Sequence, residues 1–121
     1  MSGLFGMDKM KRGEIKLVPE ADWLLMNPDN IKAIMQIPLG GDDEGARWNF
    51  YGQQIPLILD PRESIKEVKE KIAIHLNGLP NKKMKLKTNM ISILKDENTV
   101  ASYNIMDGTI IEVGLKGRGG R

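Results

Sequence analysis

Two spacings of apolar residues define the clearest elements of the chain. Residues 31 to 37 carry apolar side chains at every second position, which predicts a strand with one face on a core. Residues 64 to 76 carry them at helical intervals behind Ser64 and Glu67, whose spacing is typical of a capping box. A helix is therefore predicted over 64 to 76, and Asn77-Gly78 is suited to ending it. The apolar positions are Ile31, Ala33, Met35 and Ile37 in the strand and Ile65, Val68, Ile72 and Leu76 in the helix.

A second strand is predicted between these two elements. An acidic, glycine-rich segment at residues 40 to 45 is typical of a long solvated turn. Beyond it, Trp48 and Phe50 occupy even-numbered positions, whereas Ile55, Leu57 and Leu59 occupy odd-numbered ones. A tight turn or a bulge near residues 51 and 52 must therefore reset the register before the second strand.

Two more strands are predicted after the helix. Alternation over residues 83 to 87 places apolar side chains on one face and Lys83, Lys85 and Lys87 on the other. Another strand is predicted near residues 109 to 115, which are rich in Ile and Val. The order strand, strand, helix, strand, strand predicts a small α+β roll, in which one amphipathic helix crosses a mixed sheet.

The two ends of the chain differ from this body. The first residues lack periodicity and are expected to form a flexible leader. Pro19 suits the first position of a short helix, from which Trp23, Leu24 and Met26 dock on the body. The C-terminal end is basic and has no apolar side chain to hold it. The predicted segments are a leader (1 to 18), a helical extension (19 to 30), the main domain (31 to 115) and an Arg/Gly-rich tail (116 to 121).

Composition excludes several classes of function. The 121 residues include no cysteine, which excludes a disulfide scaffold, a thiolate metal site and a catalytic cysteine. His75 is the only histidine, and Asp42, Asp43 and Glu44 lack the ligand spacing of a calcium loop. No cofactor, metal or catalytic activity is therefore expected. No apolar run approaches the roughly 20 residues that cross a bilayer, so no membrane partner is expected.

The positive charge is concentrated at the C-terminal end. Residues 82 to 121 carry eight Lys and Arg against four acidic residues, whereas residues 1 to 81 carry ten against twelve. A basic end on a near-neutral body favours an anionic partner. The alternative is that these lysines only solvate the surface or protect an exposed strand edge.

Several segments resemble ubiquitin. Residues 65 to 72 match the pattern of its helix, and Gly78-Leu79-Pro80 matches the Gly-Ile-Pro that follows it. Residues 94 to 96 and 103 to 105 match a later turn and a short helix. The resemblance covers about residues 31 to 121 and implies the ubiquitin-like β-grasp fold, a mixed sheet with one packed α-helix.

A closer resemblance is to the C-terminal ubiquitin-like domains in the large subunits of splicing factor 3A. The matching segments are Trp48 with Gly52-Gln53, residues 83 to 86, Lys95-Asp96, residues 103 to 106, and the closing residues 115 to 121. This resemblance implies a nuclear, non-enzymatic, monomeric domain of a U2 small nuclear ribonucleoprotein component in pre-mRNA splicing. It implies binding to a stem-loop of U1 small nuclear RNA, with other spliceosomal proteins contacted by the rest of the parent chain.

The resemblance also implies which residues contact RNA. Lys83, Lys95 and Arg118 stand at positions where that family places RNA-contacting cations. The family usually has a Phe before the Lys-Asp pair, whereas this chain reads Ile91-Ser92-Ile93-Leu94 with an apparent one-residue insertion. The charge pattern adds two further lysines. The full predicted RNA-binding set is Lys83, Lys85, Lys95, Lys116, Arg118, Gly119, Gly120 and Arg121.

Two other functions remain open. A conjugated modifier would use Gly119-Gly120, but Arg121 follows and a protease would first have to remove it. A protein-interaction module would use the surface that ubiquitin presents to its receptors. The corresponding positions here hold Lys87 or Thr88 and Gly114, which offer little apolar surface.

Overall fold

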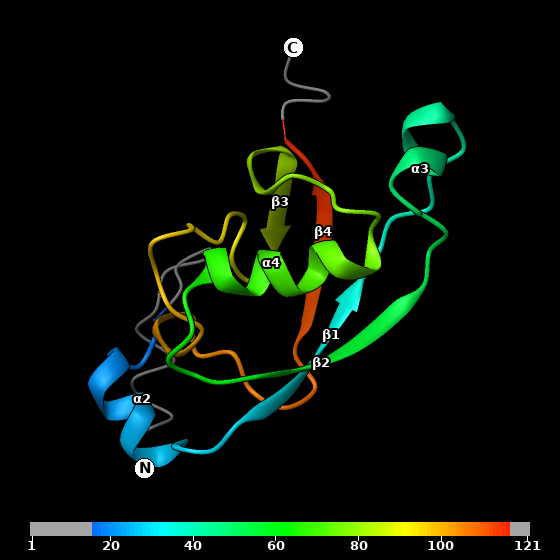
Figure 1. Cartoon of the computed structure of the whole chain (residues 1–121). Helices are drawn as coiled ribbons and strands as arrows, with labels where there is room; N and C mark the ends of the chain where they lie inside the picture. Colours follow the sequence, from blue (N-terminus) through cyan, green and yellow to red (C-terminus); the bar gives the residue numbers. More distant parts are fainter. Residues whose placement is uncertain (1–15, 117–121) are drawn as a thin grey trace.

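A computed structural model describes residues 16 to 116 of the chain (Figure 1). Most of the predicted leader and residues 117 to 121 of the predicted tail lie outside the described residues. In chain order the elements are α2 (Glu20–Met26), β1 (Ile31–Gln36), α3 (Asp43–Arg47), β2 (Gln54–Leu59), α4 (Ile65–His75), the 3₁₀ helix η1 (Asn81–Lys83), β3 (Met84–Lys87), the 3₁₀ helix η2 (Ala101–Tyr103) and β4 (Ile110–Leu115).

The four strands form one mixed sheet in the order β2-β1-β4-β3. Strand β1 pairs antiparallel with β2 and parallel with β4, and β3 pairs antiparallel with β4. Helix α4 crosses the sheet, as Figure 1 shows. The predicted α+β roll is therefore confirmed, and β4 ends beside the beginning of β3, where Leu115 pairs with Met84.

The core lies between α4 and the sheet, as the two apolar spacings predict. Ile65, Val68 and Ile72 of the helix are buried against the alternate positions of β1, which include Met35. Helix α4 begins at a complete capping box. The Glu67 amide donates to the Ser64 hydroxyl at 3.1 Å, and the Ser64 amide donates to the Glu67 carboxylate at 2.9 Å.

The acidic segment after β1 differs from the prediction of a long solvated turn. The Asp42 carboxylate accepts a hydrogen bond from the Gly45 amide at 2.8 Å and caps the five-residue helix α3. Gly45 packs on Gly40 so closely that a Cβ added to Gly45 would lie 2.6 Å from the Gly40 Cα atom. Because α3 is one short turn without an apolar stripe, periodicity could not predict it.

A turn between α3 and β2 resets the register, as expected. Trp48 lies at the C-cap of α3 rather than in a strand. Asn49 and Gly52 both adopt positive φ, which turns the chain back toward β1. Strand β2 then directs Ile55, Leu57 and Leu59 toward the core.

The N-terminal extension packs on η2 through α2. Pro19 is the N-cap residue of α2 rather than the predicted first helical residue; the helix begins at Glu20. Trp23 is buried, whereas Met26 is exposed. Val18 joins the body through Asn104, whose side chain accepts from the Val18 amide at 2.7 Å and donates to its carbonyl at 3.0 Å.

Candidate nucleic-acid interface

Lys83 and Lys116 lie side by side at one end of the sheet. The Lys116 amide donates to the Lys83 carbonyl at 2.7 Å, one step beyond the pairing of Met84 with Leu115. Lys83 is the last residue of η1 and not part of β3, which corrects the prediction that it shares a strand face with Lys85 and Lys87. The chain therefore continues into the predicted tail from a point beside Lys83.

A shallow depression brings three predicted residues together. Lys85 of β3, Lys95 of the following segment and Lys116 after β4 all line it, and all three side chains are exposed. The Leu94 amide donates to the Leu86 carbonyl at 2.9 Å, which holds the segment with Lys95 against β3. The structure thus gathers residues that are distant in sequence around one concave surface.

Two contacts fix the backbone around Lys95. Its amide donates to the Tyr103 hydroxyl at 2.8 Å. The carboxylate of the next residue, Asp96, forms an ion pair with the ammonium group of Lys69 at 2.7 Å. The Lys69 side chain is only 2% exposed. Lys69 is not among the predicted site residues, although it lies four residues after Ile65 and so on the buried stripe of α4.

Within the described residues, the cations of this surface have no ion-pair partner, as is also true of Lys32 and Arg47. In the described part of the chain, ion pairs involve Arg62, Lys69, Lys71 and Lys87. Lys87 pairs with Glu112 at 3.7 Å, and its charge is therefore partly offset. Between residues 16 and 116, the four predicted RNA-binding lysines make no ion pair: Lys83, Lys85, Lys95 and Lys116. We refer to these four as the lysine surface.

The other predicted RNA-binding residues are Arg118, Gly119, Gly120 and Arg121, and they lie outside the described residues. The last described residue is Lys116, which belongs to the lysine surface.

The two tryptophans occupy different sites. Trp23 is 8% exposed and packs between α2 and the body. Trp48 is half-buried, packs against the core and donates its indole N–H to Glu44 at 2.9 Å. Arg47 and Lys83 each place a cationic group 5.8 Å from the centre of the Trp48 ring. Trp48 therefore adjoins the lysine surface, and Trp23 does not.

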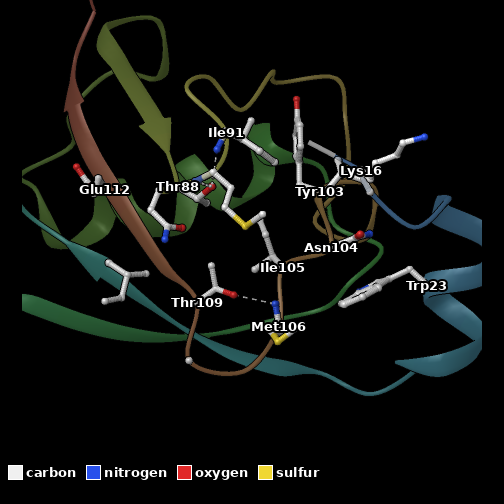
Figure 2. Close-up of a pocket in the computed structure, with 15 residues that line it drawn as sticks. Lys16, Trp23, Thr88, Ile91, Tyr103, Asn104, Ile105, Met106, Thr109 and Glu112 are labelled. Carbon is white, nitrogen blue, oxygen red and sulfur yellow. Dashed lines mark hydrogen bonds between the residues drawn. The ribbon is translucent and has the colours of Figure 1, made fainter. Parts of the chain in front are cut away.

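A second cavity, of about 570 Å³, is chemically different from the lysine surface (Figure 2). Trp23 and Asn104 lie at one end, and Thr88 and Glu112 lie at the other. Most of its lining is apolar, and the charged residues at its edge are Lys16 and Glu112, which have opposite signs. This cavity therefore lacks the accumulated positive charge that nucleic acid requires.

The residues considered for other chemistry are isolated. Within residues 16 to 116, no three His, Asp or Glu side chains are grouped to hold a metal ion. His75 is exposed at the last position of α4, where its carbonyl accepts from the Asn49 side chain at 2.9 Å. No helix in the described range has the length and apolar character needed to span a membrane.

The fold and the comparisons with known proteins agree on the class of protein. A mixed sheet crossed by one helix is the ubiquitin-like β-grasp arrangement. The model of the Ubiquitin family matches residues 49 to 118, and the chain belongs to this family. Over 113 residues, or 93% of its length, the chain is 34% identical to the C-terminal region of splicing factor 3A subunit 1 from Homo sapiens. It is 34% identical to the probable splicing factor 3A subunit 1 of Dictyostelium discoideum over the same length. The chain spans only 13% to 14% of these relatives.

Solved structures show the same relationship. A ubiquitin-like domain in a splicing factor, determined in solution, aligns with a TM-score of 0.65 and 26% identity, covering 91% of this chain and 88% of that one. A ubiquitin-like domain of an Arabidopsis thaliana protein aligns with a TM-score of 0.57 and 24% identity over 74% of this chain and 81% of its own. The second comparison supports the fold alone.

Proposed function

We propose that this chain is a non-catalytic, RNA-binding ubiquitin-like domain of a nuclear splicing factor, a component of the U2 small nuclear ribonucleoprotein, and that it contacts a stem-loop of U1 small nuclear RNA. Its similarity to splicing factor 3A subunit 1 supports the assignment to splicing. The rest of the parent chain would contact other spliceosomal proteins, and this domain would act as a monomer.

The observation that carries the proposal is the lysine surface beside the start of the tail. Double-stranded RNA is recognised mainly through its phosphates, its 2′-hydroxyl groups and its shape. Cations without anionic partners on the protein can neutralise phosphates without first breaking an ion pair. About four such contacts give a slope near −3 in a plot of log affinity against log salt.

The tail adds a different kind of contact. The guanidinium group of arginine forms bidentate hydrogen bonds with phosphates or with guanine edges. Glycine lets the backbone approach a groove closely. Arg118 and Arg121 alternate with glycines directly after Lys116. We therefore expect the tail and the lysine surface to bind one RNA together.

Measuring affinity for the U1 stem-loop by fluorescence anisotropy tests this proposal. The compared chains are the full sequence, a chain ending at Lys116, and the full-length double variant Arg118→Gln/Arg121→Gln. A control, Lys16→Gln/Lys32→Gln, removes two charges elsewhere. The proposal expects both tail variants to lose much more affinity than the control. Equal binding by all chains removes the tail from the mechanism, and no binding by the full chain overturns the proposed function.

A further inference from the structure

Trp48 has two cationic neighbours that belong to different elements. The guanidinium carbon of Arg47, in α3, lies 5.8 Å from the centre of the Trp48 ring. The ammonium nitrogen of Lys83, in η1, lies at the same distance from that ring centre. A cation over an exposed aromatic face is stabilised by about 0.5 to 1 kcal/mol, so the indole can hold both groups close to its surface.

Helix α3 is fixed in this position by contacts with the end of α4. The Asn77 side chain donates to the Arg47 carbonyl at 3.0 Å, and the Asn49 side chain donates to the His75 carbonyl at 2.9 Å. On its other side, Gly45 of α3 packs directly against Gly40. These contacts hold the backbone of α3, and with it the backbone of Arg47, in a fixed position.

The two positive charges around Trp48 are only partly balanced, because a single carboxylate is bonded to the ring. Glu44, the acidic residue that contacts the ring, accepts the indole N–H at 2.9 Å. In the part of the chain that the structure describes, neither Arg47 nor Lys83 forms an ion pair. Because both cationic groups lie 5.8 Å from the same ring centre, an RNA strand that passes this ring can bring phosphates to both of them. A guanidinium group and an ammonium group each suit a phosphate.

We propose that Arg47 and Lys83 bind RNA backbone phosphates beside the Trp48 ring, so that α3 extends the RNA-binding surface. Lys83 connects this site to the rest of the surface, because its carbonyl accepts from the Lys116 amide. The bound RNA then runs from the depression with Lys85 and Lys95, past Lys83 and Lys116, onto α3. This inference rests on the proposed function and adds Arg47 and Trp48 to the RNA-contacting residues.

The test compares Arg47→Gln with Lys32→Gln, using the U1 stem-loop and the full chain. Both substitutions remove one exposed charge, but Lys32 lies near the start of β1, at the opposite end of the sheet from Lys116. At about 0.15 M salt, one lost phosphate contact weakens binding about four- to fivefold and reduces the salt slope by about 0.7 to 0.9. We expect this effect for Arg47→Gln and none for Lys32→Gln. Equal affinities and slopes for the two variants overturn the inference.

The two indole N–H signals provide a second readout from the unmodified chain. Trp48 lies in the proposed site, whereas Trp23 is the buried residue of α2. In an NMR titration with the stem-loop, we expect the Trp48 indole signal to shift and the Trp23 signal to remain in place. If RNA binds and the Trp48 signal does not move, α3 is outside the interface while the proposed function stands. If no RNA binds, both proposals fail.

Discussion

The ammonium group of Lys69 lies 2.7 Å from the carboxylate of Asp96, the residue that follows Lys95. Lys69 is buried on α4, whereas Asp96 is partly exposed. The Lys66 amide also donates to the Asp96 carbonyl at 3.2 Å. The ion pair therefore ties the segment with Lys95 to the helix on the inner side of the sheet.

Removing Asp96 is expected to lower the free energy of unfolding more than removing Lys69. Asp96→Ala leaves a buried ammonium group without its anion and should lower the free energy of unfolding by about 2 kcal/mol, less than for a fully buried pair because Asp96 contacts water. Lys69→Met leaves a carboxylate that water can solvate and should cost less than about 1 kcal/mol. Urea unfolding measures both changes. Glu97→Ala, one residue away and exposed, is the control. Equal losses for the Asp96 and Glu97 variants would contradict this account.

The lysine surface is expected to respond to single charge removals. Lys85→Gln and Lys95→Gln should each weaken binding to the U1 stem-loop several-fold and reduce the salt slope by nearly one, because each removes a phosphate contact. Anisotropy titrations over a range of salt concentrations measure both quantities. Lys32→Gln is the matched control. A lysine whose loss leaves the slope unchanged does not contact a phosphate.

Much of the fold could be predicted because local patterns and tertiary packing agree. The capping box at Ser64 and Glu67 defined the start of α4, and the strict alternation around Met35 defined the buried face of β1. In contrast, α3 depends on an Asp42 cap and on the close contact between Gly40 and Gly45. These are properties of the folded backbone, so the spacing of apolar residues along the sequence does not predict them.

The site could be predicted only in part for a similar reason. Alternation and charge counts selected Lys85, but they placed Lys83 on a strand that begins one residue later. The contact between Lys83 and Trp48 joins segments that are distant in sequence. Lys69 was missed because a charged residue in a helix is ordinarily solvated, and only the fold shows that Asp96 pairs with it.

Asn104 is expected to hold the N-terminal extension on the body. Its φ of 55° is in the left-handed region, and its side chain makes hydrogen bonds with both the amide and the carbonyl of Val18. Asn104→Ala should cost about 2 kcal/mol because it removes these bonds and strains the backbone. Asn104→Gly should cost less, because glycine adopts this φ without strain. Thermal unfolding compares the two variants. A wild-type melting temperature for Asn104→Ala would contradict this role.

Asp60 is expected to make a contribution to stability that is lost at low pH. Hydrogen bonds at 2.9 Å from the backbone amide of Arg62 and from its guanidinium group hold the pKa of the Asp60 carboxyl below its ordinary value. A lowered pKa in the folded state stabilises the protein above the unfolded pKa of about 4, and this stabilisation is lost as the pH falls through the folded value. Carboxyl ¹³C shifts measure the titration. Because the backbone bond is the larger cause, Arg62→Gln should raise the pKa of Asp60 only partly. An ordinary pKa for Asp60 in the unmodified chain would refute this assignment.

The most direct test of RNA binding is an NMR titration of the ¹⁵N-labelled chain with the U1 stem-loop at about 0.05 M and about 0.2 M salt. Binding through four lysines and the tail predicts shifts concentrated at residues 83 to 86, 94 to 96 and 115 to 121. It also predicts an affinity that falls at least about 60-fold between the two salt concentrations, because four contacts alone give a slope near −3. Shifts centred instead on the cavity beside Trp23, or an affinity that salt leaves unchanged, would contradict it.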